Sequence, residues 1–509
     1  MANTVTNVAQ YLIEGKNPQR VALRFPQTHY TYGTLTAHAG HVADYLLAVG
    51  ARKGDPVLLI SDNSFFWVAC YVGIMQAGLV CVPIAANSRS QDIDYVLETT
   101  AARIVCAQGS IATAQDSMFA GRHLLTDKEV PPLEETVSQV GFPSLGTDAT
   151  ATHNSTPIEP NDLAALVFTS GSTGQPRGVM VSHANIISNT DSIVSYLSLS
   201  ERDRIMAVLP FHYCYGASLL HTHLRVGGEI VVDNRFMYPE VILQRIIESR
   251  CTGFAGVPSH FQILLRNSSL RKKQFPSLRY VQQAGGSLAP SFIHELRDAL
   301  PQTQIFIMYG QTEATARLSY LPPNGLETKL GSIGKGIPGV TLWVLNEDGR
   351  QVQVGEVGEI VAQGENIARG YWKDPQGSEE IFRGGKLYTG DLARVDEDGF
   401  IYIVDRAKDF LKCRGEKISC RQIEEVLLAL DELVEAAVIG IPDDVLGEAV
   451  KAFVVPRTRD SSGLAERVAS FCKSRMASPH LPKEIVVLPA LPKNSAGKVM
   501  KTALRMYEQ

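Results

Sequence analysis

The feature that most constrains this chain is a strand–loop–strand pattern over residues 163–181. Residues 163–168 are entirely apolar and predict a buried strand. The run stops abruptly at a loop of glycine and hydroxyl residues, and residues 179–181 predict a second apolar strand beyond it. The chain is therefore expected to join two buried strands through a flexible polar loop.

The composition of this loop predicts phosphate binding. Glycines at 171, 174 and 178 lack the Cβ atoms that would block backbone N–H groups from an anion. Its other polar groups are hydroxyls and one cation, namely Thr169, Ser170, Ser172, Thr173 and Arg177. A Walker A loop needs Gly-Lys-Ser/Thr leading into a helix, whereas this loop runs through Pro176 into a strand, so a P-loop ATPase is excluded. The alternative for the loop alone is an ordinary surface turn.

Further motifs follow in order along the chain. They are 209–216 (LPFHYCYG), 284–290 (AGGSLAP), 308–313 (MYGQTE), 358–360 (GEI), 370–372 (GYW), 388–391 (YTGD), 405–409 (DRAKD) and 492–498 (PKNSAGK). Together with residues 169–178, this series resembles the AMP-forming adenylating superfamily, which contains acyl-CoA synthetases, adenylation domains and beetle luciferases. The resemblance covers most of the chain, and it implies an enzyme that activates a carboxylate with ATP.

The spacing of apolar segments predicts an α/β fold. Residues 65–77 predict a helix and residues 79–82 a buried strand, the strand–helix–strand order of an α/β layer protein. A shift in pattern near residue 400 predicts a large multi-layer N-terminal domain, residues 1–405, and a small α+β C-terminal domain, residues 406–509, which the resemblance implies is mobile. The resemblance implies a hinge at 405–408, with Lys408 as its pivot.

Composition excludes several classes of protein. A formal net charge of −5 argues against a dedicated nucleic-acid binder. The apolar run at 65–86 is interrupted by Gly78 and Pro83 and lacks close basic flanks, which argues against a membrane span. Eight scattered cysteines predict reduced thiols, and no signal peptide is visible at the N-terminus. We therefore expect a cytoplasmic enzyme.

One further pattern is misleading. Residues 334–339 match G-x-G-x-x-G, but the match contains Pro338 and leads into an apparent strand at 340–344. A dinucleotide fingerprint must follow a strand and open a helix. A tight turn is therefore predicted there.

The resemblance assigns roles in the ATP site. Attack of a carboxylate on the α-phosphate requires neutralised phosphate charge, a held adenosine and a stabilised five-coordinate phosphorus. The resemblance implies Mg²⁺ at Glu313, with Thr312 beside the α-phosphate. Asp391 is implied as the acceptor for the ribose hydroxyls, and Arg406 as a residue that reaches the ribose or the phosphate.

The adenine is expected to lie against an aromatic face. Tyr309 would cover one side of the base, and the unobstructed backbone at Gly285, Gly286 and Ser287 the other. The alternative for Tyr309 is a core tyrosine. The rest of the nucleotide site is implied by the same motif at Met308, Gly310 and Gln311.

The resemblance implies that Lys498 is the catalytic cation. It ends a polar, glycine-containing turn, from which one ammonium group could reach the place where carboxylate and phosphate oxygens meet. The alternative is a solvated lysine near the C-terminus. The resemblance further implies that the small domain then rotates about the hinge, which removes Lys498 and admits a thiol.

The acceptor thiol stays open at this point. Gly415 is implied as the glycine that lets a pantetheine arm pass, but Cys420 stands where the family usually has Pro and Gln422 where it usually has Glu. Arg177 also replaces the commoner Lys, which keeps the charge and changes its shape. The acceptor is coenzyme A or the phosphopantetheine of an acyl or peptidyl carrier protein.

The substrate pocket is expected around two of the motifs. Tyr213 takes the position of the gating aromatic residue, and Cys214 falls where amino-acid-activating domains usually place an Asp for the ammonium. Met308 and Ala316 would line an apolar cavity beside Gly285. Arg317 would pair with a polar substrate tail or, equally, form a salt bridge within the large domain.

Three functions remain open from the sequence. The first is a ligase that joins a small carboxylic acid to a pantetheine thiol. The second is a stand-alone enzyme that activates an amino acid such as proline and loads a carrier protein. The third is a degenerate adenylate-binding regulator, against which the intact Lys498, Glu313 and Asp391 argue.

Overall fold

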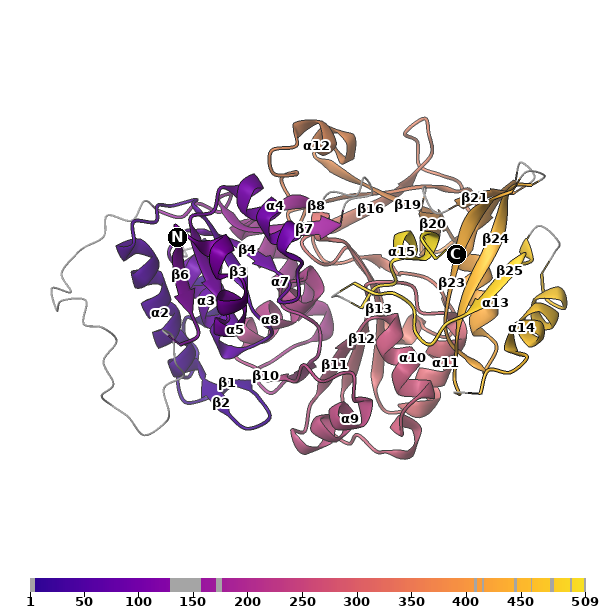
Figure 1. Ribbon diagram of the computed structural model, residues 1–509, viewed down its shortest axis with the longest axis horizontal. Helices are drawn as coiled ribbons and strands as arrows, with labels where there is room; N and C mark the ends of the chain where they lie inside the picture. The colour runs from indigo at the N-terminus through magenta and orange to yellow at the C-terminus, as the bar shows by residue number, and fades with distance from the viewer. Residues whose placement is uncertain are drawn as a thin grey trace. The chain divides into compact units, whose positions relative to one another are not determined.

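The computed structural model describes residues 5–128, 157–170, 176–406, 410–413, 416–443, 446–458, 460–476, 480–494 and 497–507. The chain forms two compact units, whose elements are labelled in Figure 1. Unit 1 comprises Met1–Asn234, Gln311–Arg317 and Glu365–Phe382, and unit 2 comprises Arg235–Gly310, Leu318–Gly364 and Arg383–Gln509.

Unit 1 contains a largely parallel sheet in the order β6-β5-β3-β4-β7-β8. Its strands are β3 (Pro56–Ile60), β4 (Val80–Ile84), β5 (Ile104–Ala107), β6 (His123–Thr126), β7 (Leu163–Ser170) and β8 (Pro176–Ser182). Only β8 runs antiparallel to its neighbour, β7. The two strands predicted at 163–168 and 179–181 are therefore confirmed, and residues 171–175 of the predicted loop lie outside the described residues.

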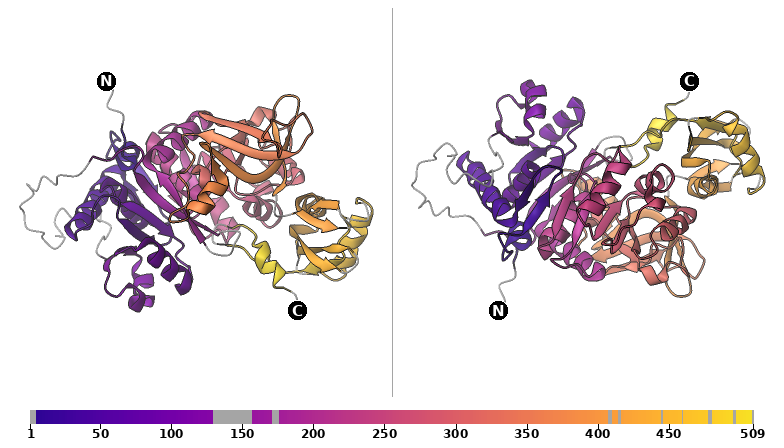
Figure 2. Two further views of the ribbon diagram at one scale, coloured as in Figure 1. Left: turned by 90° about the horizontal axis from the view of Figure 1, so that it is seen from above. Right: turned by 90° about the horizontal axis from the view of Figure 1, so that it is seen from below.

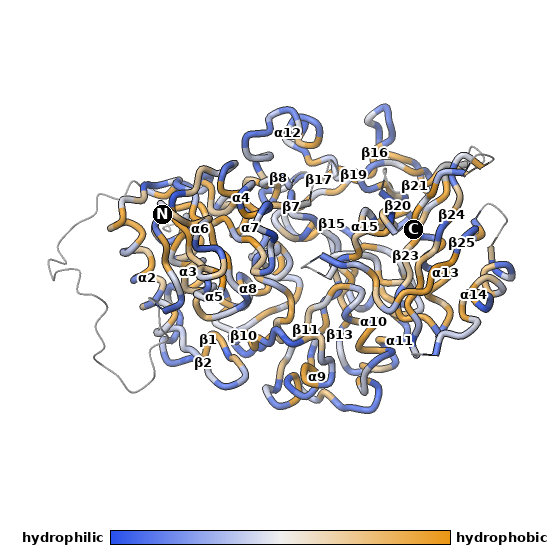
Figure 3. The backbone as a smooth tube through the Cα atoms, viewed as in Figure 1, coloured by the Kyte–Doolittle hydropathy of each residue, from blue (hydrophilic) through white to orange (hydrophobic). Residues whose placement is uncertain are grey.

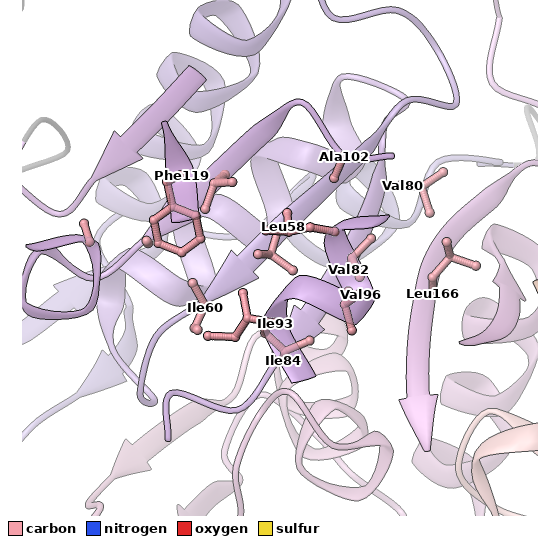
Figure 4. Close-up of a cluster of buried hydrophobic side chains, with 14 residues drawn as sticks. Leu58, Ile60, Val80, Val82, Ile84, Ile93, Val96, Ala102, Phe119 and Leu166 are labelled. Carbon is pink, nitrogen blue, oxygen red and sulfur yellow. The ribbon is translucent and has the colours of Figure 1, made fainter. Parts of the chain in front are cut away.

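Apolar side chains of this sheet pack against a helix on one face. Leu58, Ile60 and Val82 on the strands meet Ile93 and Val96 of α4 (Ser90–Thr100) in a cluster of buried residues (Figure 4). Branched aliphatic residues at alternating strand positions fill such an interface densely. This packing fixes the strand from which the glycine-rich loop departs.

The helix α3 (Phe65–Gln76) is buried on every side. It starts at Ser64, whose hydroxyl accepts a hydrogen bond from the backbone N–H of Trp67. All its residues except Gln76 are buried, which explains why its sequence shows no amphipathic pattern. Among the described residues, no helix is long and apolar enough to cross a membrane.

Four strands of unit 1 follow one another in the order β9-β10-β1-β2. They are β1 (Val21–Arg24), β2 (His29–Thr31), β9 (Arg204–Ala207) and β10 (Glu229–Val232). The larger helices of this part are α2 (Tyr32–Ala48), α7 (His183–Leu197) and α8 (Cys214–Val226), and the shorter ones include α1 (Val8–Ile13), α5 (Gly109–Ala114), α6 (Asp116–Phe119) and α12 (Pro375–Ile381). The helix α7 opens with a capping box between Ser182 and Asn185.

Unit 2 contains five strands in the order β11-β12-β13-β14-β15. They are β11 (Gly253–Gly256), β12 (Tyr280–Gln283), β13 (Gln304–Tyr309), β14 (Ser319–Leu321) and β15 (Lys335–Gly336). The accompanying helices are α9 (Pro239–Glu248), α10 (Pro258–Arg266) and α11 (Pro290–Ala299). Each of these helices begins with proline. An N–H at the first helical position has no partner within the helix, so proline loses no hydrogen bond there.

An antiparallel sheet of unit 2 follows. Its strands β16 (Val340–Leu345), β17 (Gly358–Gly364), β19 (Lys386–Val395) and β20 (Ile401–Arg406) pair in that order. The G-x-G-x-x-G segment leads into β16, so the predicted strand there is confirmed and no helix follows the match.

The C-terminal part of unit 2 is a second mixed sheet, seen in yellow in both views of Figure 2. Its strands are β21 (Phe410–Cys413), β22 (Glu416–Ser419), β23 (Leu433–Asp443), β24 (Gly447–Pro456) and β25 (Glu484–Val487). One face packs on α13 (Cys420–Leu428) and α14 (Leu464–Lys473), and the other meets Leu504 of α15 (Lys501–Arg505). The apolar residues of β23 and α13 stand out in Figure 3. A domain boundary at 405–408 stays a prediction.

Candidate active site

The predicted site residues of unit 1 gather on a short segment, Gln311–Arg317. Thr312 and Glu313 lie in one turn of 3₁₀ helix, and Thr312 is buried. The hydroxyl of Thr312 donates to the sulfur of Cys214, the first residue of α8, at 3.4 Å. Two residues predicted from motifs far apart in the sequence are thus brought together.

A buried asparagine holds this segment in place. The amide nitrogen of Asn366 donates to the carbonyl of Arg317 at 2.8 Å and to that of Ala314 at 3.3 Å. Thr315 adopts a φ of 65°, which costs backbone strain for a β-branched residue. Its hydroxyl donates to the carbonyl of Asn366 at 2.7 Å, which holds the strained turn.

Glu313 is held by a tyrosine of unit 1. The hydroxyl of Tyr371 donates to Oε1 of Glu313 at 2.8 Å. Burial, and next the charge of Glu313, raise the pKa of Tyr371 well above its usual value, so its hydroxyl stays protonated as a donor. The guanidinium of Arg177 lies over the ring of Tyr371 at 5.1 Å from its centre, and its Nε lies 3.4 Å from a carboxylate oxygen of Asp374.

The glycine-rich loop is described only at its two ends. Thr169 of β7 lies opposite Arg177 of β8 in the antiparallel ladder. Gly171, Ser172, Thr173 and Gly174 lie outside the described residues, as does the side chain of Ser170. The phosphate-binding role of the loop therefore stays a prediction.

The chemistry of this segment is compatible with a polar ligand and with Mg²⁺. The side-chain nitrogen of Gln311 is buried and has no hydrogen-bond partner among the described residues, a costly arrangement that a ligand acceptor would relieve. No group of three or more metal-binding side chains occurs among the described residues. A lone carboxylate at Glu313 agrees with Mg²⁺ held mainly by substrate phosphates and water.

The pocket residues predicted beside this segment differ in burial, and Tyr213 and Cys214 are only partly buried. Tyr213 immediately precedes α8, and burial lowers the pKa of the neighbouring His212 to about 4, so this imidazole is neutral at pH 7. Ala316 is buried. Arg317 is only 1% exposed, and its guanidinium stacks on the ring of Tyr215 at 4.2 Å from the ring centre. This cation–π contact was in neither of the two interpretations of Arg317 from sequence.

In unit 2, the predicted ribose acceptor Asp391 is buried and bonded twice. The hydroxyl of Tyr309 donates to its Oδ2 at 2.6 Å, and Nε of Arg406 donates to its Oδ1 at 3.0 Å. Burial and the charge of Asp391 raise the pKa of Tyr309 well above its usual value. Three residues predicted to hold adenosine therefore form one connected cluster.

The predicted catalytic lysine lies near the glycine motif of unit 2. A Cβ atom placed on Gly285 would lie 3.7 Å from Cε of Lys498 and 2.9 Å from a methyl group of Val257. Gly285 adopts a φ of 85°, a further reason for glycine at this position. The structure thus brings together Lys498 and a motif more than two hundred residues earlier in the sequence.

The turn that carries Lys498 is tied to itself and to α10. The backbone N–H of Lys498 donates to Oδ1 of Asn494 at 3.0 Å, and the N–H of Asn494 donates to the carbonyl of Lys498 at 2.9 Å. The hydroxyl of Ser259 donates to the carbonyl of Gly497 at 3.2 Å. These bonds fix the backbone from which the lysine side chain extends.

The remaining predicted residues of unit 2 lie at strand ends. Gly286 and Ser287 are exposed beyond β12, and the carbonyl of Gly286 accepts from the side chain of Gln283 at 2.8 Å. Met308 is buried at the end of β13, and Gly310 follows it partly exposed. The pivot Lys408 and the glycine Gly415 lie outside the described residues.

Sequence reasoning missed the residues that orient the predicted ones. Tyr371 belongs to a recognised motif, but nothing in its spacing connects it to Glu313. Asn366 and Asp374 carried no signal at all, because each acts through a contact with a distant segment.

The chain is similar to known proteins in both sequence and structure. A family model described as AMP-binding enzyme matches residues 14–372, and one described as AMP-binding enzyme C-terminal domain matches residues 422–498. Feruloyl-CoA synthase of Amycolatopsis sp is 30% identical over 493 residues, which cover 96% of this chain and 96% of that protein. The crystal structure of ATP-bound MatB from Rhodopseudomonas palustris matches with a TM-score of 0.85 at 26% identity, covering 98% of both chains.

A second solved structure carries a related ligand. It is o-succinylbenzoate CoA synthetase (MenE) from Bacillus subtilis in complex with its acyl-adenylate intermediate, which matches with a TM-score of 0.83 at 25% identity and covers 98% of both chains. The predicted α/β fold is confirmed by these likenesses. They extend over nearly the whole chain.

Proposed function

The chain belongs to the AMP-binding enzyme family and is an AMP-forming acid–thiol ligase, and from this premise we propose that it activates an apolar carboxylic acid with ATP and transfers the acyl group to the thiol of coenzyme A. In the first step, an oxygen of the carboxylate attacks the α-phosphorus of ATP and the bond to the bridging oxygen breaks. Pyrophosphate leaves. In the second step, the pantetheine sulfur attacks the acyl carbon, its proton passes to solvent, and AMP leaves.

The observation that carries this proposal is the position of Lys498 beside Gly285. In a transition state that gathers negative oxygens around phosphorus, an oriented ammonium stabilises charge that the ground state lacks. The tied turn at Asn494 and Gly497 supports that orientation. We therefore assign Lys498 to adenylation.

Other residues would bind rather than react. Asp391 would accept the two ribose hydroxyls, with Tyr309 and Arg406 holding its oxygens in place. Gln311 and the 169–178 loop, including Arg177, would serve the phosphates, and Thr312 would lie at the α-phosphate. Mg²⁺, when bound, would neutralise phosphate charge, and Glu313 is the carboxylate that would hold it.

An apolar acid is proposed because of Cys214. A thiol supplies no negative charge at neutral pH unless it is unusually acidic, and a buried ammonium without a partner costs several kcal/mol. An α-amino acid would therefore lack its usual counter-charge at this position. The similar protein from Amycolatopsis is a feruloyl-CoA synthase, which supports an aromatic or aliphatic acid without an amino group.

Coenzyme A is proposed as the acceptor because the similar protein from Amycolatopsis sp is named feruloyl-CoA synthase, and one from Humulus lupulus, 28% identical over 98% of this chain, is named probable CoA ligase CCL9. A carrier protein is the alternative acceptor. Among the described residues no cysteine forms a disulfide, and the cytoplasm is the compartment we propose for the enzyme.

The test is pyrophosphate release across a panel of fatty, aromatic, dicarboxylic and amino acids, including proline. Each acid is supplied with ATP, Mg²⁺ and either CoA or a phosphopantetheinylated carrier protein. Mass spectrometry identifies the acylated acceptor. We expect fastest release with an apolar acid and acylation of CoA. Fastest release with an amino acid, or acylation of the carrier alone, would contradict the proposal.

A further inference from the structure

One helix of unit 2 contacts the C-terminal part at both of its ends. At the start of α10, Ser259 bonds to Gly497 in the turn that carries Lys498. At its other end, Arg266 reaches the segment that follows α13. Between them, Ile263 packs against the apolar cluster of the C-terminal sheet. The helix therefore links the catalytic turn with a second anchor.

Arg266 is the anchor with the most contacts. Its Nη1 donates to the carbonyls of Leu430, at 3.1 Å, and Leu433, and its Nη2 donates to that of Leu428 at 3.3 Å. The last carbonyls of a helix lack partners within the helix and carry the negative end of its dipole. One guanidinium thus satisfies carbonyls at and just beyond the end of α13.

The charge of Arg266 is also compensated. Its side chain is 2% exposed, and Nη2 lies 2.9 Å from a carboxylate oxygen of Glu295 and 3.7 Å from one of Asp431. The guanidinium stacks over the ring of Phe292 at 4.1 Å from the ring centre. Glu295 and Phe292 lie on α11, so the arginine joins two helices of unit 2 to its C-terminal part.

We propose that Arg266 is a positioning residue for adenylation, which keeps the C-terminal part where Lys498 reaches Gly285. The nine residues of α10 span about 13 Å at 1.5 Å per residue. Because a helix of this length is stiff, the anchor at one end sets the place of the turn at the other. The inference rests on the proposed function in one respect, the role of Lys498 in adenylation.

The residue type supports this role. A planar guanidinium presents several donors in a fixed arrangement, whereas an ammonium is a compact point charge. The guanidinium of Arg266 donates hydrogen bonds to the carbonyls of residues 428, 430 and 433 and also to the carboxylate of Glu295. Lysine at position 266 would keep the charge and lose most of these bonds.

The test compares Arg266→Met, Arg266→Lys and the matched control Arg271→Ala. Arg271 pairs with the other oxygen of the same Glu295 at 2.7 Å and is 44% exposed. Pyrophosphate release is measured with the best acid of the panel, and thioester formation is measured from supplied acyl-adenylate and CoA. Amide hydrogen exchange follows residues 428–433 and 497–500 without any substrate.

We expect Arg266→Met to lower kcat of adenylation about 10-fold to 100-fold, the cost of a displacement of about 1 Å. The KM for ATP and the thioester step should stay within about twofold of wild type, since the ATP-binding residues are untouched. The kcat of Arg266→Lys should lie between those of Arg266→Met and wild type, and Arg271→Ala should resemble wild type. Exchange at 428–433 and 497–500 should rise only in the Arg266 variants.

Two results would overturn the inference. One is an equal fall in both half-reactions, which would mark Arg266 as a residue for stability alone. The other is unchanged exchange at 497–500 in Arg266→Met. Hydrogen exchange needs no reaction, so it decides the anchoring role even where the wild-type enzyme releases no pyrophosphate with any acid. A wild-type enzyme that releases no pyrophosphate with any acid would count against the proposed function. The exchange data would then decide by themselves whether Arg266 anchors the turn.

Discussion

The two units assemble their predicted site residues in different ways. In unit 1, Thr312, Glu313, Ala316 and Arg317 come from one continuous segment, Gln311–Arg317, held by Asn366. We call these residues, with Cys214, Arg177 and Tyr371, the unit 1 cluster. The unit 2 cluster is Gly285, Tyr309, Asp391, Arg406 and Lys498, and each of its members comes from a different element or loop.

This difference teaches where each cluster is vulnerable. Covalent continuity fixes the spacing of Thr312, Glu313, Ala316 and Arg317 within the unit 1 cluster, so a substitution on that segment changes the chemistry of one group. In the unit 2 cluster, the distances between residues depend on tertiary packing. The position of Lys498 depends on the packing of the whole C-terminal part. We expect the largest functional loss from the unit 2 cluster and smaller, more specific losses from the unit 1 cluster.

The largest effect is expected for Lys498→Ala. Adenylation should fall by about a thousandfold or more, since an oriented charge acts mainly in the transition state, while ATP affinity changes little. Thioester formation from supplied acyl-adenylate should largely survive. Pyrophosphate release under saturating ATP and acid measures the first quantity.

The control for this lysine is Lys483→Ala, which removes an exposed lysine of the C-terminal part paired with Asp443. It should behave as wild type. Near-normal pyrophosphate release by Lys498→Ala would remove the reason for ranking the unit 2 cluster first.

Glu313→Gln should have the next largest effect. Loss of the carboxylate charge weakens Mg²⁺ binding, so the Mg²⁺ concentration for half-maximal adenylation should rise and the rate should fall about 10-fold to 100-fold. The amide still accepts the bond from Tyr371, so the melting temperature should hold. Unfolding without a change in metal dependence would show that Glu313 serves structure instead.

Cys214→Asp should have a moderate and substrate-specific effect. A carboxylate at position 214, where the present thiol lies 3.4 Å from the hydroxyl of Thr312, introduces charge into the proposed acyl pocket. Turnover of an apolar acid should fall about tenfold, because an unpaired buried charge is costly, and turnover of a primary α-amino acid should rise in relative terms. Competing-acid kinetics measure this ratio. Cys214→Ser is the matched control, because it keeps an acceptor for Thr312.

Tyr371→Phe should have the smallest effect. It removes the single hydrogen bond to Glu313 and keeps the ring beneath Arg177. A bond to a charged group is worth about 1.5–3 kcal/mol at most, and water can replace part of it at a partly exposed site. We expect a severalfold rise in the Mg²⁺ requirement with unchanged ATP affinity. An effect as large as that of Glu313→Gln would show that the unit 1 cluster is also cooperative.

Much of the fold could be predicted because apolar runs report burial directly. The strand expected at 79–82 overlaps β4 (Val80–Ile84), and that expected at 340–344 overlaps β16 (Val340–Leu345). Element ends were less accurate, since the strand expected at 163–168 extends to Ser170 and that expected at 179–181 begins at Pro176. The two strands pair through Thr169–Arg177 and Ser170–Pro176, and residue polarity alone does not indicate this pairing.

The sequence indicated the candidate site residues but not the contacts between them. The motifs identified Tyr309 and Asp391 separately, and only the fold shows that one donates to the other. Likewise, neither Arg177 nor Glu313 indicates that Tyr371 lies against both. Such contacts join residues that are tens to hundreds of positions apart, and no local pattern encodes them.

The complete burial of α3 has a consequence for the synthesis of the chain. Tyr71 of this helix donates or accepts a 2.8 Å hydrogen bond with His221, which lies 150 residues later in the sequence. At about 5–20 residues per second, a ribosome delivers that partner roughly 8–30 seconds after Tyr71 itself. Throughout this interval the most apolar helix of the protein lacks part of its cover. A chaperone that binds apolar segments should therefore be found on nascent chains that end between residues 76 and 221, and should leave once α8 has emerged.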